Sequence, residues 1–234
     1  PLEMTIDEME QAVYDTIEIN KDHFNEEDEH RIMINVTRGL IPIYENRVGT
    51  GAGPNVIISN YPLRWTVQSL GHLYTSGINL VVVNQRAIPA YLLEPKIKNR
   101  SRLHYQMANI EASLFKGKDN WAMLLDPDGF VTEGTGDNIF IVKDGVVITP
   151  EGRNILRGVS RQYVLDLCKR LGIPCVEKNI ETYDVMFADE CFVTATPFCI
   201  LPVMRLNGQP IGNGGYGKMT KYLLNEWSKD VGLD

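Results

Sequence analysis

The chain has 234 residues, of which 44% are hydrophobic and 23% charged, and this balance excludes the disordered, collagen-like and coiled-coil classes. Lysine and arginine number 23 against 30 aspartates and glutamates, so the formal net charge is −7, which argues against nucleic acid or an acidic membrane surface as a partner. The longest apolar runs fall far short of the roughly 20 residues that cross a bilayer.

The cysteines and histidines point to neither disulfides nor a metal. The four cysteines form no Cys-x-x-Cys pair, and a chain of this size needs no disulfide framework, so the sequence predicts a reduced, cytoplasmic protein. The four histidines lie far apart and lack the close pairing of a zinc site, which predicts that no metal is bound.

The chain opens with an amphipathic helix over residues 5–25. Thr5 is the expected N-cap, and Glu8 completes a capping box. Because the chain begins at Pro1, directly before this cap, we expect that residues upstream of it are missing.

Two strands, over residues 31–38 and 55–61, follow the helix. The glycine-rich stretch 49–54 between them lacks the Gly-Lys-Ser/Thr ending of a phosphate loop and leads into a strand, so it predicts a hairpin turn. Residues 62–77 form a connector with a short helical piece. The predicted domains are a small α/β domain over 1–65 and a larger domain over 66–234.

A buried strand over residues 78–83 opens the larger domain, and a helix is expected over 103–115. The basic stretch 96–102 lies between them. If this stretch is extended, its four cations share one face, and their repulsion predicts either hydration or a bound anion.

The rest of the chain alternates short strands and helices. Residues 123–125, 130–132, 139–142 and 146–148 predict an antiparallel meander. Helices are expected over 160–171, 180–187 and 218–231, with strands over 174–177 and 191–194.

Three segments combine polar groups with a flexible or helix-starting backbone, and each has a plain structural alternative. Glu133 ends a strand and is followed by glycines, which suits a close ligand or a tight hairpin. Ser160 stands at a helix start, which suits an anion site or an ordinary N-cap. Thr194 to Pro197 follow a strand and suit phosphate binding or a turn.

From about Arg31 to the C-terminus, these segments in this order resemble the class IV (fold-type IV) pyridoxal-phosphate aminotransferases, which include branched-chain and D-amino-acid enzymes. The resemblance implies an α/β (α+β) fold with a small α/β domain and a larger pseudo-barrel domain that binds pyridoxal phosphate, in a homodimer. The most specific matches are Glu133-Gly134-x-Gly136-x-Asn138, Lys143-Asp144-Gly145 before Thr149-Pro150, Leu156-x-Gly158-Val159-Ser160-Arg161, Glu190-x-Phe192-x-Thr194-x-Thr196 and Gly217-x-x-Thr220-Lys221.

The same resemblance implies roles for individual residues. Lys98 lies 13 residues before Glu111-Ala112, the family's spacing for the lysine that forms a Schiff base with the cofactor. Glu133 is implied to keep the pyridine nitrogen protonated, so that ping-pong transamination moves an amino group from an amino acid to a 2-oxo acid. The other cofactor-binding residues implied are Asn138, Val159, Ser160, Ala195 and Thr196.

The chain departs from the family pattern at three places. The family's phosphate-anchoring arginine lies upstream of this chain, and Leu103 replaces the tyrosine that branched-chain enzymes carry five residues after the lysine, for which Tyr105 is not an equivalent. Pro197 lacks the backbone N–H that branched-chain enzymes offer to the substrate carboxylate.

These departures leave the substrate open between two classes. Arg38, in a segment similar to D-amino-acid and (R)-amine transaminases, is predicted to bind the substrate carboxylate, which slightly favours the D-amino-acid type. Thr135 and Gly136 are the other predicted substrate contacts, and Gly136 resembles the branched-chain type. The alternatives are an (R)-amine transaminase, a lyase of the aminodeoxychorismate type and a non-catalytic anion-binding relative.

Overall fold

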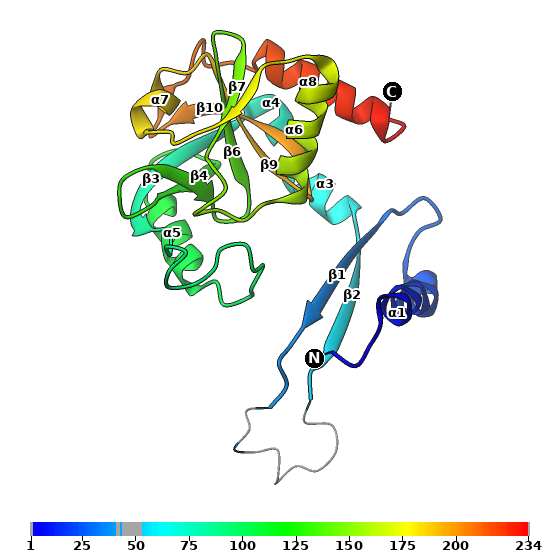
Figure 1. Ribbon diagram of the computed structural model, residues 1–234. Coiled ribbons are helices and arrows are strands. Elements are labelled where there is room, and N and C mark those ends of the chain that lie inside the picture. The colour runs from blue at the N-terminus through cyan, green and yellow to red at the C-terminus, as the bar shows by residue number, and fades with distance from the viewer. Residues whose placement is uncertain (1, 41–42, 44–52, 234) are drawn as a thin grey trace. The chain divides into compact units, whose positions relative to one another are not determined.

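The computed structural model describes residues 2–40, 43 and 53–233 (Figure 1). The chain divides into two compact units, Pro1–Ser69 and Leu70–Asp234. Whether 1–65 and 66–234 act as separate functional domains stays a prediction.

The first unit consists of a helix and a hairpin, followed by nearly all of the short helix α3 (Arg64–Leu70). Helix α1 (Ile6–Asn20) continues into a 3₁₀ turn at Lys21–His23 and packs on strand β2 (Val56–Pro62), which pairs antiparallel with β1 (His30–Val36). The capping box is confirmed, because Thr5 Oγ1 accepts from Glu8 N at 3.2 Å and Glu8 Oε2 accepts from Thr5 N at 2.7 Å. Most of the predicted glycine turn, residues 49–52, lies outside the described residues.

The described part of the second unit is built on a nine-stranded sheet with helices on its outside. Strand β9 pairs with both β10 and β6, so that β3, β4, β5, β6, β9 and β10 form a closed ring. The strands are β3 (Ile78–Arg86), β4 (Asn120–Leu125), β5 (Val131–Gly134), β6 (Asn138–Lys143), β7 (Val146–Thr149), β8 (Cys175–Glu177), β9 (Glu190–Ala195), β10 (Cys199–Leu206) and β11 (Gln209–Pro210). Its helices are α4 (Leu73–Ser76), α5 (Leu103–Ser113), α6 (Val159–Leu171), α7 (Thr182–Met186) and α8 (Lys218–Asp230).

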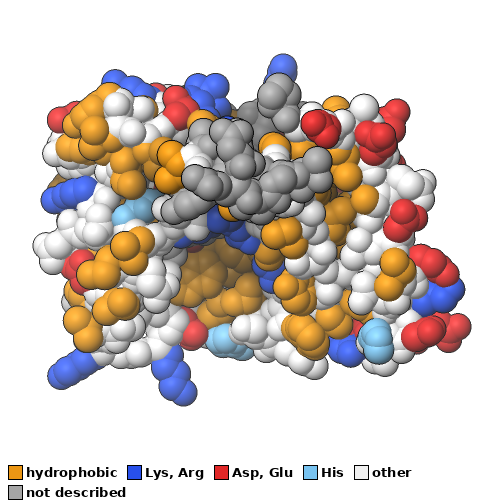
Figure 2. Space-filling model, turned by 90° about the horizontal axis from the view of Figure 1, so that it is seen from below, with side chains coloured by type: hydrophobic (Ala, Val, Ile, Leu, Met, Phe, Trp, Pro, Cys, Tyr) orange, Lys and Arg blue, Asp and Glu red, His pale blue; other side chains and the backbone are white. Residues whose placement is uncertain are grey.

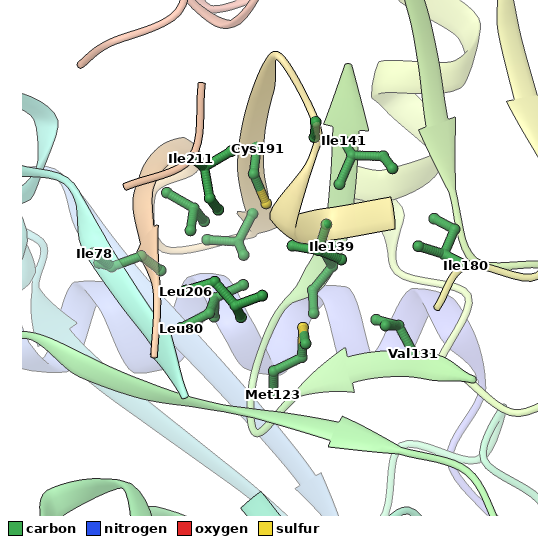
Figure 3. Close-up of a cluster of buried hydrophobic side chains, with 14 of the residues drawn as sticks. Ile78, Leu80, Met123, Val131, Ile139, Ile141, Ile180, Cys191, Leu206 and Ile211 are labelled. Atoms are coloured by element: carbon green, nitrogen blue, oxygen red, sulfur yellow. The ribbon is translucent and has the colours of Figure 1, made fainter. Parts of the chain in front are cut away.

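The interior of the ring is filled by alternate residues of its strands, as period-2 geometry requires. Ile139 and Ile141 of β6 point inward with Cys191 and Val193 of β9, and Met123 of β4 joins them (Figure 3). The intervening side chains face outward. The predicted meander is confirmed, because β4, β5, β6 and β7 pair successively and antiparallel.

Helices cover the outward-facing residues. Phe140 of β6 and Phe192 of β9 stack with ring centroids 4.9 Å apart, in a cluster that α6 and α8 complete. Helix α5 covers a different part of the ring, where its Ala108 and Ala112 pack against β3 and β4. The small alanines let α5 lie close to the strands, and this brings the residues at its start toward the end of β5.

Three local expectations differ from the structure. The stretch 96–102 consists of turns and irregular backbone, so the extended alternative with four cations on one face is wrong. Helix α6 begins at Val159 with Gly158 as its N-cap, so Ser160 is not the cap. Strand β10 was not predicted, because Pro202 lies within it. Cys199 begins the strand with a φ of 57°.

Candidate functional site

The most constrained polar group at the predicted site is the carboxylate of Glu133, at the end of β5. Its Oε1 accepts a hydrogen bond from Tyr105 Oη at 2.9 Å, and its Oε2 accepts from Leu156 N at 3.0 Å and Asn138 Nδ2 at 3.1 Å. These donors come from α5, from the segment before α6 and from β6. A carboxylate has about four acceptor positions, so the donors among the described residues leave one, on Oε1, for a further donor.

Burial dominates the electrostatics of Glu133. It raises the pKa of this carboxyl to about 7, against the opposing effect of the hydrogen bonds from Tyr105 and Leu156 N. The neighbouring Asp137 carboxyl also raises the Glu133 pKa, and the Arg102 guanidinium lowers it. An additional positively charged donor at Oε1 would therefore stabilise the carboxylate form.

Asp137 is a second buried carboxyl, four residues further along the turn between β5 and β6. Burial raises its pKa to about 7, and within the described part of the chain its Oδ1 has no hydrogen-bond partner. A Cβ at Gly134 would lie 2.5 Å from both Asp137 carboxyl oxygens, which explains the glycine. Because the two carboxyls repel each other, ionisation of one opposes ionisation of the other.

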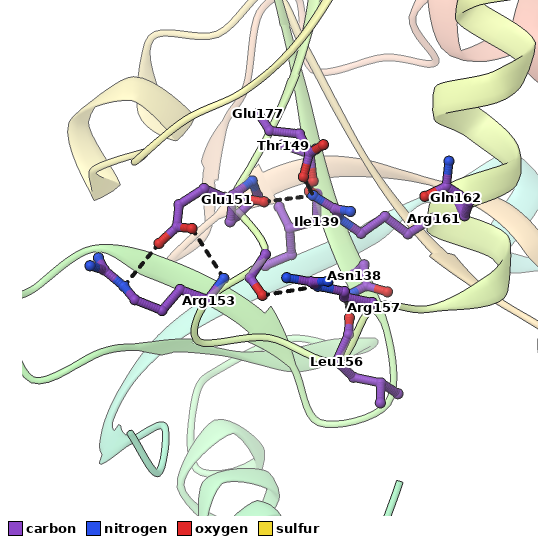
Figure 4. A network of polar contacts seen from close by, with 12 residues as sticks. Asn138, Ile139, Thr149, Glu151, Arg153, Leu156, Arg157, Arg161, Gln162 and Glu177 are labelled. Carbon is purple, nitrogen blue, oxygen red and sulfur yellow. Dashed lines mark hydrogen bonds and ion pairs between the residues drawn. The ribbon is translucent and has the colours of Figure 1, made fainter. Parts of the chain in front are cut away.

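Asn138 connects this turn to the start of α6. Its Nδ2 donates to Leu156 O at 2.9 Å as well as to Glu133, and a Cβ at Gly158 would lie 2.3 Å from its Oδ1 (Figure 4). Gly158 is therefore required where the α6 N-terminus approaches β6. This contact joins two of the segments that match the family, residues 133–138 and 156–161.

The N-terminus of α6 offers backbone donors. The first hydrogen bond within the helix is from Gln162 N to Gly158 O, so the N–H groups of Val159 and Ser160 precede it and remain available to an anion. Helix α6 packs on β9, whose end carries Thr194 and Ala195, with the exposed Thr196 after it. Among the described residues, the buried Thr194 Oγ1 has no partner.

Lys98 lies in the irregular segment before α5 and is exposed. Partial burial of its ammonium lowers the Lys98 pKa, Arg102 and Arg100 lower it further, and the Glu133 carboxylate raises it. Lys98 is thus close enough to Glu133 and Arg102 to respond to their charges. Arg102 donates from Nη2 to Thr135 O, and its guanidinium lies 4.8 Å from the centre of the Tyr105 ring.

A hollow of about 380 Å³ adjoins the turn between β5 and β6. The predicted substrate contacts Thr135 and Gly136 line it, and Thr135 Oγ1 donates to Asn109 Oδ1 at 2.9 Å. The other residues lining it are Asn109, Asn120, Trp121, Asp137 and Phe198.

All the predicted site residues except Arg38 belong to the second unit. Arg38 is exposed just after β1 in the first unit, so its position relative to the others is not defined. The sequence reasoning assigned no role to Tyr105 or Asp137. Tyr105 could have been found, because it precedes Ala108 and Ala112 by three and seven residues and so shares their helix face.

The residues present fit the cofactor that the resemblance implies. A phosphate would find the backbone donors at the start of α6, and a protonated ring nitrogen would find the remaining acceptor position of the buried Glu133 carboxylate. Across the described ranges, no group of three or more His, Cys, Asp or Glu side chains is arranged to hold a metal ion. No helix in the described part is long and apolar enough to cross a membrane.

Comparison with known proteins points in the same direction. The family model for class IV amino-transferases matches residues 1–206. A putative branched-chain-amino-acid aminotransferase of Methanocaldococcus jannaschii is 42% identical over 156 residues, which cover 66% of this chain and 53% of that protein. A D-alanine aminotransferase of Bacillus licheniformis is 31% identical over 194 residues, covering 81% of this chain and 63% of that protein.

The fold is also shared with a solved structure. The branched-chain amino acid aminotransferase of Thermobaculum terrenum in its PLP form matches with a TM-score of 0.83 and 26% identity, over 99% of this chain and 72% of that one. The chain therefore spans between about half and three quarters of the length of these proteins.

Proposed function

The chain belongs to the class IV aminotransferase family, and on that premise we propose that it is a pyridoxal-phosphate-dependent aminotransferase. It would transfer an amino group from an amino acid to a 2-oxo acid. The observation that carries the proposal is the buried Glu133 carboxylate, held by three donors with one acceptor position remaining. The relatives reported above are named as aminotransferases, so the lyase and non-catalytic alternatives gain no support from them.

Each proposed residue has a defined task. The N–H groups of Val159 and Ala195 and the hydroxyls of Ser160 and Thr196 would hold the cofactor phosphate. Glu133, oriented by Asn138, would hold a proton on the ring nitrogen. When bound, pyridoxal phosphate supplies an electron sink for the bond broken at the substrate α-carbon.

Lys98 Nζ is the proposed proton carrier. An amine can accept a proton only in its neutral form, and the lowered Lys98 pKa increases the neutral fraction near pH 7. Arg102 and Arg100 contribute to that lowering through their charge. Partial burial and then the surrounding cations thus favour the form of Lys98 that the reaction needs.

Two donor classes are supported by different features. Arg38 and Pro197 favour a D-amino acid, in line with the D-alanine aminotransferase match. Gly136 favours a branched-chain amino acid, in line with the archaeal match. We propose that the donor belongs to one of these two classes, with Thr135 and Gly136 contacting it.

We further propose that the chain forms a homodimer in the cytoplasm. The resemblance implies the dimer, and the free thiols of the four cysteines agree with a reducing compartment. Helix α5 and its C-cap expose a stripe of apolar side chains, and Figure 2 shows hydrophobic side chains among charged ones on the face seen from below. The stripe consists of Leu103, Met107, Ile110 and Leu114. Sedimentation analysis of wild type and Ile110→Glu tests the dimer.

The test of function is covalent trapping of the cofactor. Protein incubated with pyridoxal phosphate is reduced with borohydride, and the modified lysine is mapped by mass spectrometry. We expect modification at Lys98 in wild type and in the control Lys96→Ala, and its loss in Lys98→Ala. Absence of modification in wild type would overturn the proposal.

The substrate class is tested with the same protein. D-alanine, L-leucine and an (R)-amine are added separately with a 2-oxo acid acceptor, and amination of the acceptor is measured. Turnover of D-alanine alone supports the D-amino-acid type, and turnover of L-leucine alone supports the branched-chain type. Absence of acceptor amination from all three donors would count against an aminotransferase of either class.

A further inference from the structure

We propose that Tyr105, whose ring contacts Arg102, is a positioning residue of this site and that its hydroxyl fixes the Glu133 carboxylate in the orientation and charge state that receive the ring nitrogen. The proposal rests on the proposed function, because it concerns how Glu133 is prepared for the cofactor. It assigns a role to a tyrosine seven residues after Lys98, where the sequence comparison with the family assigned none.

The first step of the argument is the distribution of donors on Glu133. Oε2 is held by two donors, Leu156 N and Asn138 Nδ2, whereas Tyr105 Oη at 2.9 Å is the one donor to Oε1 among the described residues. Oε1 also carries the remaining acceptor position. Tyr105 therefore controls the oxygen that would meet the ring nitrogen.

The second step is that Tyr105 is itself fixed. It lies on the α5 face that packs against β3 and β4, together with Ala108 and Ala112. The Arg102 guanidinium lies 4.8 Å from the centre of the Tyr105 ring while its Nη2 donates to Thr135 O. Arg102 thus connects the start of α5 to the turn that follows Glu133 and contacts the Tyr105 ring.

The third step concerns charge. Burial, and then the charge of Glu133, raise the Tyr105 pKa, so the phenol keeps its proton and acts as a donor. The charged groups that face Glu133 are Asp137, which raises its pKa, and Arg102, which lowers it, while Lys98 responds to the Glu133 charge. Loss of the Tyr105 hydroxyl would remove a donor that stabilises the carboxylate and raise the Glu133 pKa further.

The test is Tyr105→Phe, which keeps the ring and its contact with Arg102 and removes the hydroxyl alone. Its matched control is Tyr163→Phe, because Tyr163 Oη also donates to a carboxylate, that of Asp230, between α6 and α8. Pyridoxal phosphate affinity is measured by titration from pH 6 to pH 9. A hydrogen bond to a charged group corresponds to roughly one pKa unit, so the affinity of Tyr105→Phe should fall about fivefold at pH 7 and approach wild type at pH 9.

A second readout needs no cofactor. The Glu133 carboxyl is titrated by carbon NMR in cofactor-free protein, and its pKa should rise by about one unit in Tyr105→Phe and stay unchanged in Tyr163→Phe. An unchanged Glu133 titration, or a loss of affinity equal at every pH, would overturn the role of Tyr105. A shifted titration in a wild-type protein that binds no pyridoxal phosphate would support the hydrogen-bond coupling and overturn the proposed function instead.

Discussion

Two glutamates of the second unit are held in nearly the same way and serve different ends. Glu133 accepts three hydrogen bonds at the candidate site, and Glu190, at the start of β9, accepts from Met219 N at 2.9 Å, Thr220 N at 2.8 Å and Thr220 Oγ1 at 2.8 Å. A Cβ at Gly217 would lie 2.0 Å from Glu190 Oε2, just as glycines make room at the candidate site.

The difference lies in what surrounds each carboxylate. Glu190 is half-buried at the N-terminus of α8, where the backbone donors and the helix dipole stabilise its charge. Glu133 is 6% exposed, faces the Asp137 carboxyl and has a pKa raised to about 7. Similar hydrogen bonding thus joins β9 to α8 at Glu190, whereas at Glu133 it holds a buried carboxyl that can titrate near pH 7.

Of the variants that distinguish the role of Glu133 from that of Glu190, Glu133→Gln should have the largest effect. The amide keeps the shape of the side chain and cannot hold a proton on a ring nitrogen, so we expect transaminase activity to fall about 100-fold or more. The midpoint of urea unfolding should change little, because a buried, partly unfavourable charge is removed. Steady-state kinetics and urea titration check the two expectations, and activity within threefold of wild type would contradict the first.

Glu190→Gln should show the opposite pattern. It weakens charge-assisted hydrogen bonds to the start of α8, at a cost of about 2 kcal/mol in the free energy of unfolding. Pyridoxal phosphate affinity at 25 °C should stay within twofold of wild type. Urea titration and cofactor titration measure the two quantities, and a selective loss of affinity would show that Glu190 belongs to the site.

Asp137→Asn sharpens the comparison through pH. Removing the Asp137 charge removes a cause of the raised Glu133 pKa, so the acid limb of pyridoxal phosphate binding should move to lower pH, by about half a unit. An unchanged acid limb, measured by cofactor titration, would show that Asp137 stays protonated over that range.

The stability of Asp137→Asn should depend on pH as well. A carboxyl whose folded-state pKa lies above its unfolded value favours folding at low pH, and that stability is lost as pH rises toward about 7. Each pKa unit corresponds to about 1.4 kcal/mol, so wild type should lose up to a few kcal/mol between pH 4 and pH 7 through this group. Urea unfolding of Asp137→Asn should show a flatter dependence over that range.

The parts of the fold that follow from local patterns were predictable. Short continuous apolar runs identified β6 and β9, and the Thr5–Glu8 capping box placed the start of α1. Closure of the ring depends on β10, which contains Pro202 and so does not match a strand pattern, and on pairings between segments far apart in the chain.

The candidate site was predictable only where the sequence motif itself carries the contact. Glu133 and Asn138 lie close together in the chain, and the structure shows them hydrogen-bonded. Tyr105 is 28 residues from Glu133: its helix face is predictable from Ala108 and Ala112, but no local pattern shows that this face meets the Glu133 carboxylate. The buried state of Asp137 was equally hidden, because it depends on how the turn packs rather than on its residue types.

The two variants with the smallest expected effects give the closest comparison between Glu133 and Glu190, because each variant removes one hydroxyl donor from one carboxylate. Thr220→Val deletes the hydroxyl that donates to Glu190 and keeps the side-chain volume in a fully buried position, so the free energy of unfolding should fall by about 1 kcal/mol without loss of pyridoxal phosphate affinity. Tyr105→Phe should lower the affinity near pH 7 with a smaller change in unfolding. If both variants changed both quantities in the same proportion, the division between a structural and a functional carboxylate would be wrong, because one coupled network would then link α8 to the site.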